Sequence, residues 1–382
     1  MLGGALAVIL TGQISLPDAL GAINTEVMLF LLGMFIVGEA LVESGYLSTI
    51  SCRFFSRART PGQMIFFILF GMGFLSALLM NDTLAIIGTP LVMGLAAKFR
   101  ISPKLVLLSL AIAITTGSVM SPIGNPQNLL IAVNSGLKAP FVTFGLYLLL
   151  PTLISLGAAF LVLRFFFQGD FSARALVHEV APEYDPVKVL PIRCSLAILL
   201  FLAAINITAS LAGGTVLVPL PFIAVCAAVP VLLFSSGRVD LVRNIDWYTL
   251  VFFAAMFVLM ESVWQTGFFQ SFVSGSHLTT VPAILGTSVI ISQFISNVPF
   301  VALFQPMILQ AGGTTSQMMA LAAGSTIAGN LTILGAASTV IIIQNAEKQG
   351  ETLTFFEFAR VGVPLTVLQI AVYWVWLILL PF

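Results

Sequence analysis

The chain has 382 residues, of which 59% are hydrophobic and only 8% charged, and its 15 basic residues balance its 15 acidic ones. Soluble domains carry about 25% charged residues, so this composition excludes a water-soluble protein and predicts a multi-pass protein of the cytoplasmic membrane. Apolar segments of about 20 residues between short polar loops favour an all-α polytopic membrane protein over a barrel. The zero net charge identifies no partner, and we expect the lipid bilayer but no nucleic acid as one.

Long apolar runs predict the membrane spans. The first run is short and has no Lys or Arg before it, which is unlike a signal peptide, so we expect a shortened first span in a repeat whose N-terminus is incomplete. Cys52, Cys194 and Cys226 form no metal or disulfide pattern. The predicted spans are 3–12, 26–45, 141–165, 193–212, 215–236, 247–267 and 359–381.

Two further regions combine apolar arms with polar breaks. In each region we expect two arms that meet at an Asn to form a re-entrant hairpin, followed by a broken transmembrane helix. The first region has arms 63–80 and 84–97 around Asn81, then segment 104–136 with interruptions at Thr115–Ser118 and Ser121–Pro126. The second has arms 281–295 and 299–311 around Asn297, then segment 316–346 with interruptions at Gly329–Thr332 and Gly335.

The two halves repeat one another in order. Asn81 and Pro90 recur as Asn297 and Pro306 at an offset of 216, Ile123-Gly124 recurs as Leu334-Gly335 at 211, and Met34-Phe35, Glu39 and Gly45 recur at 222. An odd number of crossings per unit predicts inverted repeats. We therefore expect a first repeat at 1–167, a cytoplasmic linker at 168–192 and a second, inverted repeat at 193–382.

Basic residues predict the orientation, because cytoplasmic loops carry excess Lys and Arg. If the loop with Arg53, Arg57 and Arg59 is inside, fourteen of the fifteen basic residues fall inside and only Lys138 falls outside. Residues 46–58 are then expected along the inner membrane surface. The matched Glu39 and Glu261 suggest a shared packing role, with Glu39 kept as an alternative proton carrier.

Asp82 is the residue that most needs an explanation, because a carboxylate at membrane depth is costly. Helix N-termini attract anions, whereas a carboxylate and unwound carbonyls attract Na⁺ or H⁺; helix capping alone is the alternative. We expect no cofactor besides the coupling ion, and a Na⁺ site at Asn81, Asp82 and Asn125. The candidate substrate and ion-binding residues are Asn81, Asp82, Thr83, Thr116, Gly117, Ser118, Ser121, Gly124, Asn125, Asn128, Ser296, Asn297, Gly329, Asn330, Thr332, Gly335 and Ser338.

Four stretches carry a family resemblance: LLMNDTLAIIGTPLVM, GSVMSPIGNPQNLLIA, SQFISNVPFVALFQP and AGNLTILGAASTVII. They resemble the ArsB/NhaD permease (ion transporter) superfamily, are most similar to its uncharacterised anion-permease members, and are related to the divalent-anion/sodium symporters. The resemblance implies inverted repeats, each with a re-entrant hairpin and a broken helix around a midplane site, in a homodimer that works by elevator-like movement.

The hairpin tips depart from the sodium-coupled carboxylate branch, whose tips carry Ser-Asn-Thr. Here the tips read Met80-Asn81-Asp82 and Ser296-Asn297-Val298. This change argues against di- and tricarboxylates and suits a coupling cation, a proton or a neutral metalloid oxyacid such as arsenous acid.

The predicted function is a secondary active transporter that moves a small inorganic or organic anion, coupled to H⁺ or Na⁺. A Na⁺/H⁺ antiporter, an arsenite efflux permease and a non-transporting intramembrane enzyme or scaffold are the alternatives. The sequence has no GxxxxGK[ST] motif for an ATPase and no catalytic triad pattern, so we expect neither ATP-driven pumping by this chain nor an enzyme.

Overall fold

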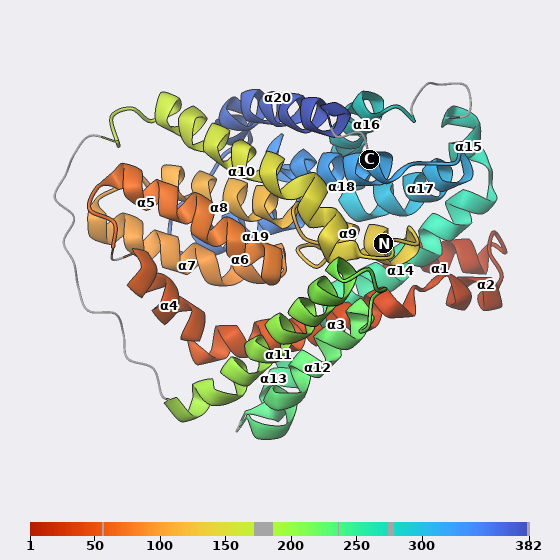
Figure 1. The fold of residues 1–382 in the computed structure, drawn as a ribbon, viewed down its shortest axis with the longest axis horizontal. Coiled ribbons are helices and arrows are strands. Elements are labelled where there is room, and N and C mark those ends of the chain that lie inside the picture. The colour runs from red at the N-terminus through yellow and green to blue at the C-terminus, as the bar shows by residue number, and fades with distance from the viewer. Residues whose placement is uncertain (56, 172–185, 236, 274–278, 380–382) are drawn as a thin grey trace.

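The computed structural model describes residues 1–55, 57–171, 186–235, 237–273 and 279–379, and the regular elements in these ranges are helices (Figure 1). In chain order they are α1 (Leu2–Leu10), α2 (Leu16–Ala22), α3 (Thr25–Ser44), α4 (Tyr46–Phe55), α5 (Pro61–Phe67), η1 (Ile68–Met72), α6 (Gly73–Leu78), α7 (Asn81–Phe99), α8 (Pro103–Ser118), α9 (Pro126–Asn134), α10 (Pro140–Phe166), α11 (Pro186–Leu211), α12 (Leu220–Phe234), α13 (Arg238–Asn244), α14 (Trp247–Gln265), α15 (Phe268–Val273), α16 (Val281–Ile295), α17 (Asn297–Gln310), α18 (Thr315–Ile327), η2 (Ala328–Asn330), η3 (Ile333–Gly335), α19 (Ala337–Glu347) and α20 (Phe355–Leu379).

Several of these helices are long and apolar enough to cross a bilayer, which confirms an all-helical, multi-span membrane protein. Among the described residues there are six: five begin and end within about four residues of a predicted span, and Pro61–Leu78 corresponds to the predicted arm 63–80. The six are Thr25–Ser44, Pro61–Leu78, Pro140–Phe166, Val189–Leu211, Trp247–Gln265 and Phe355–Leu379. Of the predicted linker, residues 172–185 lie outside the described ranges, and residues 186–192 form the first turns of α11.

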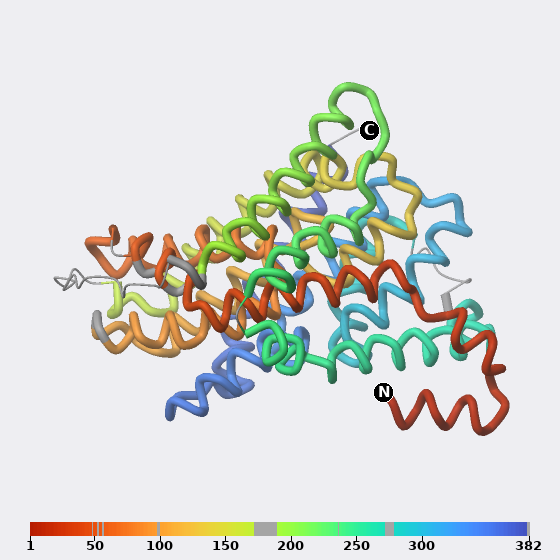
Figure 2. Tube along the Cα trace, turned by 90° about the horizontal axis from the view of Figure 1, so that it is seen from below, coloured from red at the N-terminus to blue at the C-terminus, as the bar shows by residue number. Residues whose placement is uncertain are grey.

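The helices form two groups that lie side by side. In Figure 1 the lower group contains α3 and α11 to α13, while α5 to α10 and α16 to α20 form the upper group. Helix α3 packs tightly on α12, because a Cβ atom on Gly33 would lie 2.7 Å from the backbone carbon of Ala224. Figure 2 shows α1 at the periphery, where it packs on α14.

The predicted arms are confirmed, and each pair meets at a short non-helical break. Helix α6 ends at Leu78 and α7 begins at Asn81, while only Ser296 separates α16 from α17. The chain reverses direction between α6 and α7 (Figure 1). Beyond each pair of arms lies an interrupted helix: α8 and α9 are separated by residues 119–125, and α18 and α19 by a stretch that contains the 3₁₀ segments η2 and η3.

The predicted interruption at Thr115–Ser118 is wrong, because α8 stays helical through Ser118. The Ser118 hydroxyl donates to the Thr115 carbonyl at 2.9 Å, so the polar side chain is satisfied within the helix. Gly117 serves packing: a Cβ atom there would lie 2.2 Å from the Gly73 carbonyl oxygen on α6. The break begins at Val119 instead.

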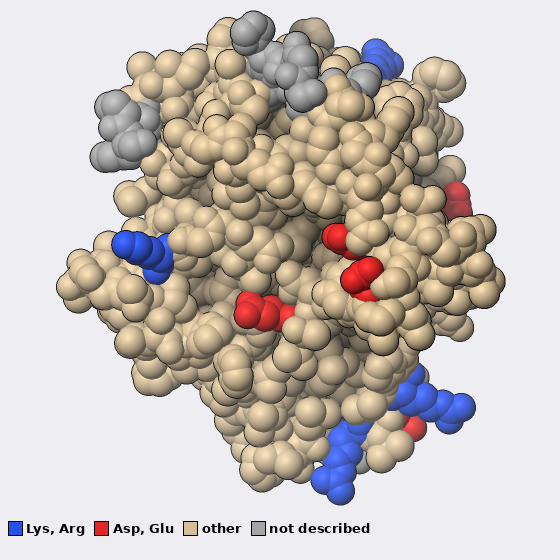
Figure 3. Space-filling model, turned by 90° about the vertical axis from the view of Figure 1, so that its right-hand side faces the viewer, with Lys and Arg blue, Asp and Glu red and all other residues tan. Residues whose placement is uncertain are grey.

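The surface of the bundle is largely apolar. Phe201 and Leu161 are both 64% exposed and Val367 is 60% exposed, as helices that face lipid require. Figure 3 looks at the end of the molecule that lies on the right in Figure 1. This end carries few charges: acidic side chains lie around a hollow near its centre, and the basic ones lie toward its edge.

Candidate functional site

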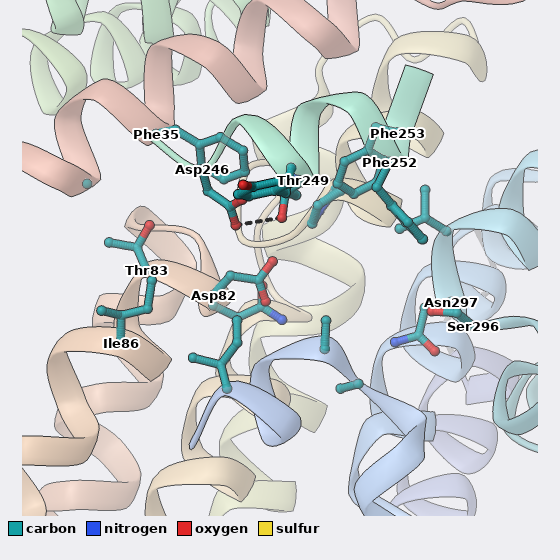
Figure 4. A pocket seen from close by; sticks show the side chains of 18 of the residues that line it. Phe35, Asp82, Thr83, Ile86, Asp246, Thr249, Phe252, Phe253, Ser296 and Asn297 are labelled. Carbon is teal, nitrogen blue, oxygen red and sulfur yellow. Dashed lines mark hydrogen bonds between the residues drawn. The ribbon is translucent and has the colours of Figure 1, made fainter. Parts of the chain in front are cut away.

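The two helix breaks meet at one cavity of about 420 Å³, which we call the tip cavity. It is bounded by the first turns of α7 and α17 and by residues of α3, α9, α14 and α19 (Figure 4). Its polar lining residues include Glu39, Asn81, Asp82, Asp246, Ser296 and Asn297.

Two helix N-termini face this cavity. The first N–H groups of a helix have no partner within it and carry partial positive charge, and here these ends are at Asn81 and Asn297. The Asn81 backbone N–H donates to the Gly124 carbonyl at 3.1 Å, which anchors the first tip to the break between α8 and α9. At the second tip, Ser296 has φ 68° and ψ 162°, a region that costs a non-glycine residue about 1–3 kcal/mol.

The amide oxygens of Asn81 and Asn297 are buried and have no hydrogen-bond partner. The two residues are 7% and 6% exposed, and both line the tip cavity. Leaving such an acceptor unsatisfied costs about 1–3 kcal/mol, so it usually indicates a missing partner. Because both residues line the same cavity, a ligand bound there is a candidate for the partner that their amides lack.

Carboxylates approach the same space. Asp82 lies in the first turn of α7, Asp246 caps α14, and Glu39 comes from α3. The Asp246 carboxylate is held in place, since it accepts from the Thr249 N–H at 3.0 Å and from its hydroxyl at 2.6 Å. In Figure 4, Asp82 and Asp246 point toward one another, and Asn297 reaches in from the other side. No Lys or Arg is among the described residues that line the tip cavity.

Five of the predicted site residues line the tip cavity, namely Asn81, Asp82, Thr83, Ser296 and Asn297. The other candidates lie outside its lining, where they shape the breaks behind it, and a binding role for them stays a prediction. Of the three predicted Na⁺ ligands, Asn81 and Asp82 are brought together in the cavity lining, whereas Asn125 is not. Among the described residues, no group of three or more His, Cys, Asp or Glu side chains could hold a metal ion.

Buried amides hold the break between α8 and α9. Asn125 Nδ2 donates to Ser118 Oγ at 2.9 Å and to Thr326 Oγ1 at 3.2 Å. Asn128 Nδ2 donates to the carbonyls of Ser118, Val119 and Ser121 at 3.0 to 3.2 Å. The Asn128 amide thus supplies a donor to carbonyls at the end of α8 and in the break, and the bond from Asn125 to Thr326 ties this break to α18.

A second set of buried contacts holds the break after α18. Asn330 Nδ2 donates to Thr116 Oγ1 and Gln369 Oε1, both at 2.9 Å, and Thr332 Oγ1 donates to Gln293 Oε1 at 2.7 Å.

Small residues allow both breaks to close. A Cβ atom on Gly124 would lie 2.5 Å from the Ser118 carbonyl oxygen, one on Gly329 would lie 2.6 Å from the Ala336 Cβ, and one on Gly335 would lie 2.3 Å from the Ala328 carbonyl oxygen. Ser121 Oγ accepts from the Ile123 N–H at 3.3 Å. The hydroxyl of Ser338 is buried without a partner.

Sequence reasoning missed Asp246, Gln127 and Thr249, which also line the tip cavity. Asp246 precedes an apolar span, where an Asp is explained by helix capping alone. One signal could have found it: at the offset of 222 that matches α3 with α14, Asp246 corresponds to Asn24, and both residues cap the helix that follows them.

The protein is helical and has several membrane spans, and its tip cavity is lined by two helix N-termini, by carboxylates and by two Asn residues whose amide oxygens have no partner. These are the characteristics of a membrane transporter. The sequence model of the citrate transporters, CitMHS, matches residues 1–318. The chain therefore belongs to the CitMHS citrate transporter family, and the predicted membership of the ion transporter superfamily is confirmed.

Relatives agree with this assignment, and a solved structure has a similar fold. An uncharacterized transporter of Mycobacterium tuberculosis is 27% identical and matches 97% of this chain and 90% of its own length. The silicon efflux transporter LSI3 of Oryza sativa subsp. japonica is 25% identical, with the same shares covered. The crystal structure of the Alcanivorax borkumensis YdaH transporter has a similar fold, with a TM-score of 0.62 and 17% identity over 97% of this chain and 87% of that chain.

Proposed function

We propose that the chain is a secondary transporter that moves a small oxyanion or uncharged oxyacid, coupled to H⁺ or Na⁺, through the tip cavity. The observation that carries this proposal is the meeting of Asn81, Asn297 and Asp82 at one cavity, with both amide oxygens unpartnered. The two helix N-termini favour an electron-rich substrate oxygen, and the carboxylate with the amide oxygens favours a cation.

Asp82 is the proposed coupling group. Its carboxylate can take a proton, or it can coordinate Na⁺ together with the amide oxygens of Asn81 and Asn297. Asp246 lies across the cavity and raises the negative potential there, which increases the affinity for a cation. A bound cation in turn reduces the repulsion that an incoming oxyanion meets.

The charge of the lining limits the substrate class. Binding a polyanion such as citrate inside a membrane calls for basic partners, and no Lys or Arg is among the described lining residues. A neutral oxyacid, or an anion accompanied by a cation, fits this lining better. One relative is named a silicon efflux transporter, which is consistent with a small oxyacid, and an arsenite efflux permease remains a form of the same proposal.

The proposal includes an architecture. The halves 1–167 and 193–382 act as inverted repeats, α5 to α7 and α16 to α17 act as re-entrant hairpins, and two copies form a homodimer. The repeat is supported by the matched breaks, which follow the same order in both halves. Inverted repeats give a transporter two related conformations, open to opposite sides.

A Na⁺/H⁺ antiporter is the second candidate, and the three carboxylates at a cavity without basic residues favour it. Flux in proteoliposomes separates the two functions. We expect uptake of arsenite, silicate, phosphate or another small oxyacid that depends on a Na⁺ or H⁺ gradient. Dissipation of a pH gradient by Na⁺ alone, with no anion or oxyacid present, would instead identify an antiporter and overturn the oxyacid proposal.

A further inference from the structure

A second cavity, of about 390 Å³, lies beside Glu261, and we call it the Glu261 cavity. It is lined by Asn24, the cap residue before α3, and by parts of α9, α14 and α17, three helices that also line the tip cavity. Along each shared helix the two cavities occupy different turns. On α14, for example, Glu261 borders the Glu261 cavity and Phe253 borders the tip cavity.

The two cavities are built from corresponding residues of the two repeats. Five pairs of lining residues, one from each cavity, are related by the offset of 222. The pairs are Phe35 and Phe257, Gly38 and Met260, Glu39 and Glu261, Val42 and Trp264, and Asp246 and Asn24. Ile86 and Ala302 correspond at the offset of 216, and Leu130 and Ile341 at 211. The Glu261 cavity is therefore the repeat-related counterpart of the tip cavity.

The barrier between the cavities is thin. On α9 the linings come as close as Gln127 and Leu130, and on α14 as Phe253 and Phe257. A spacing of three or four residues is about one helical turn, roughly 5.4 Å. In the intervening turns, Met256 of α14 and Asn128 of α9 are fully buried, so packed side chains separate the two cavities there.

Polar groups of the Glu261 cavity suit a cation. Glu261 is half-buried, and its Oε1 accepts from Gln265 Nε2 at 3.1 Å. Gln305 is 1% exposed, and its Nε2 donates to the Ile131 carbonyl at 3.3 Å and to Ser135 Oγ at 3.0 Å. Because these bonds occupy the nitrogen, the amide oxygen is the group of Gln305 that can serve a ligand. Glu261 is the one charged side chain among the described lining residues.

We propose that the Glu261 cavity is the opposite mouth of the transport path and that Glu261, with the Gln305 amide oxygen, holds the coupling cation there. The cation, H⁺ or Na⁺, exchanges between Asp82 at one mouth and Glu261 at the other as the repeats interchange conformations. This inference rests on the proposed function, because it assigns a second station to the same coupled ion.

Labelling of single cysteines tests the two mouths without any flux. In a chain with Cys52, Cys194 and Cys226 replaced by Ser, we would introduce Ile86→Cys for the tip cavity and Ala302→Cys for the Glu261 cavity. A membrane-impermeant methanethiosulfonate should modify the two cysteines from opposite sides of the membrane. Ala111→Cys, in the closed core of α8 and 1% exposed, is the unreactive control.

Two labelling results would overturn the second mouth: an Ala302→Cys chain as unreactive as Ala111→Cys, or one labelled from the same side as Ile86→Cys. Since water access is measured directly, such a result would leave the proposed transport function standing. Conversely, absent flux with opposite-sided labelling would contradict the proposed function and not the two mouths.

Glu261→Gln tests the ion station. We expect Na⁺- or H⁺-driven flux to fall by about tenfold or more, the effect of losing one contact to a charged group. Glu26→Gln is the matched control, because Glu26 lies in the first turn of α3 and lines neither cavity. Equal flux in the two variants, with opposite-sided labelling intact, would remove Glu261 from the path of the ion.

Discussion

Asparagine has two different roles in this molecule, and the hydrogen bonds distinguish them. The amides of Asn125 and Asn330 donate to other buried side chains and thereby hold the helix breaks. The amide oxygens of Asn81 and Asn297 have no donor, and both residues line the tip cavity. The sequence marks all four as polar residues in apolar surroundings, so it could not separate the amides that bond within the protein from those whose oxygens have no partner.

Alanine substitutions at these residues should have opposite effects. Asn330→Ala removes the donor to Thr116 and Gln369 and should lower the free energy of unfolding by about 1–3 kcal/mol. Asn297→Ala should change the stability of the ligand-free protein by less than about 0.5 kcal/mol but abolish the stabilisation by Na⁺ or substrate. Thermal melting in NaCl and in choline chloride measures both effects, and retained Na⁺ stabilisation in Asn297→Ala would count against its role.

At the scale of single elements, the breaks could be predicted because Asn, Pro and Gly mark them locally. Thr115–Ser118 misled the prediction because the Ser118 hydroxyl bonds within the helix, Thr116 bonds to Asn330 and Gln369 on other elements, and the reason for Gly117 lies at Gly73 on α6. Asp246 was missed for a similar reason. It joins Asp82 at the tip cavity from 164 residues further along the chain, and local sequence explains it as a cap.

The contact between α3 and the first tip gives a prediction at this scale. A Cβ atom on Gly38 would lie 2.8 Å from Thr83 Oγ1 and 2.9 Å from its Cγ2. Gly38→Ala should therefore destabilise the protein by about 1–3 kcal/mol through overpacking, and Thr83→Ala in the same chain should restore most of this loss.

Gly157→Ala on α10 is the matched control for this experiment, since a Cβ atom there meets nothing within 4 Å. The measured quantity is the shift in melting temperature of the purified protein. If Gly38→Ala melts as Gly157→Ala does, or if Thr83→Ala brings no recovery, α3 does not contact the tip as closely as described.

At the scale of the whole molecule, composition and periodicity sufficed to predict an all-helical membrane protein and the order of its helices. The meeting of both tips at one cavity depends on packing between distant segments, and in the sequence only the similarity between the two halves indicated that the tips belong together.

The orientation in the membrane is still a prediction from charge. With single cysteines at Gln168 and Lys138, an impermeant reagent applied outside intact cells should label the Lys138→Cys chain only. If only the Gln168→Cys chain were labelled, the orientation in the membrane would be the opposite of the predicted one.

The most direct test of the central claim is ion-coupled flux through Asp82→Asn in proteoliposomes. The substitution keeps the size of the side chain but removes the charge and the capacity to carry a proton, so the protein should fold and melt as the unmodified chain does. We expect oxyacid flux that no longer responds to a Na⁺ or pH gradient. An unchanged transport rate over a range of pH and Na⁺ would contradict the assignment of Asp82 as the coupling group.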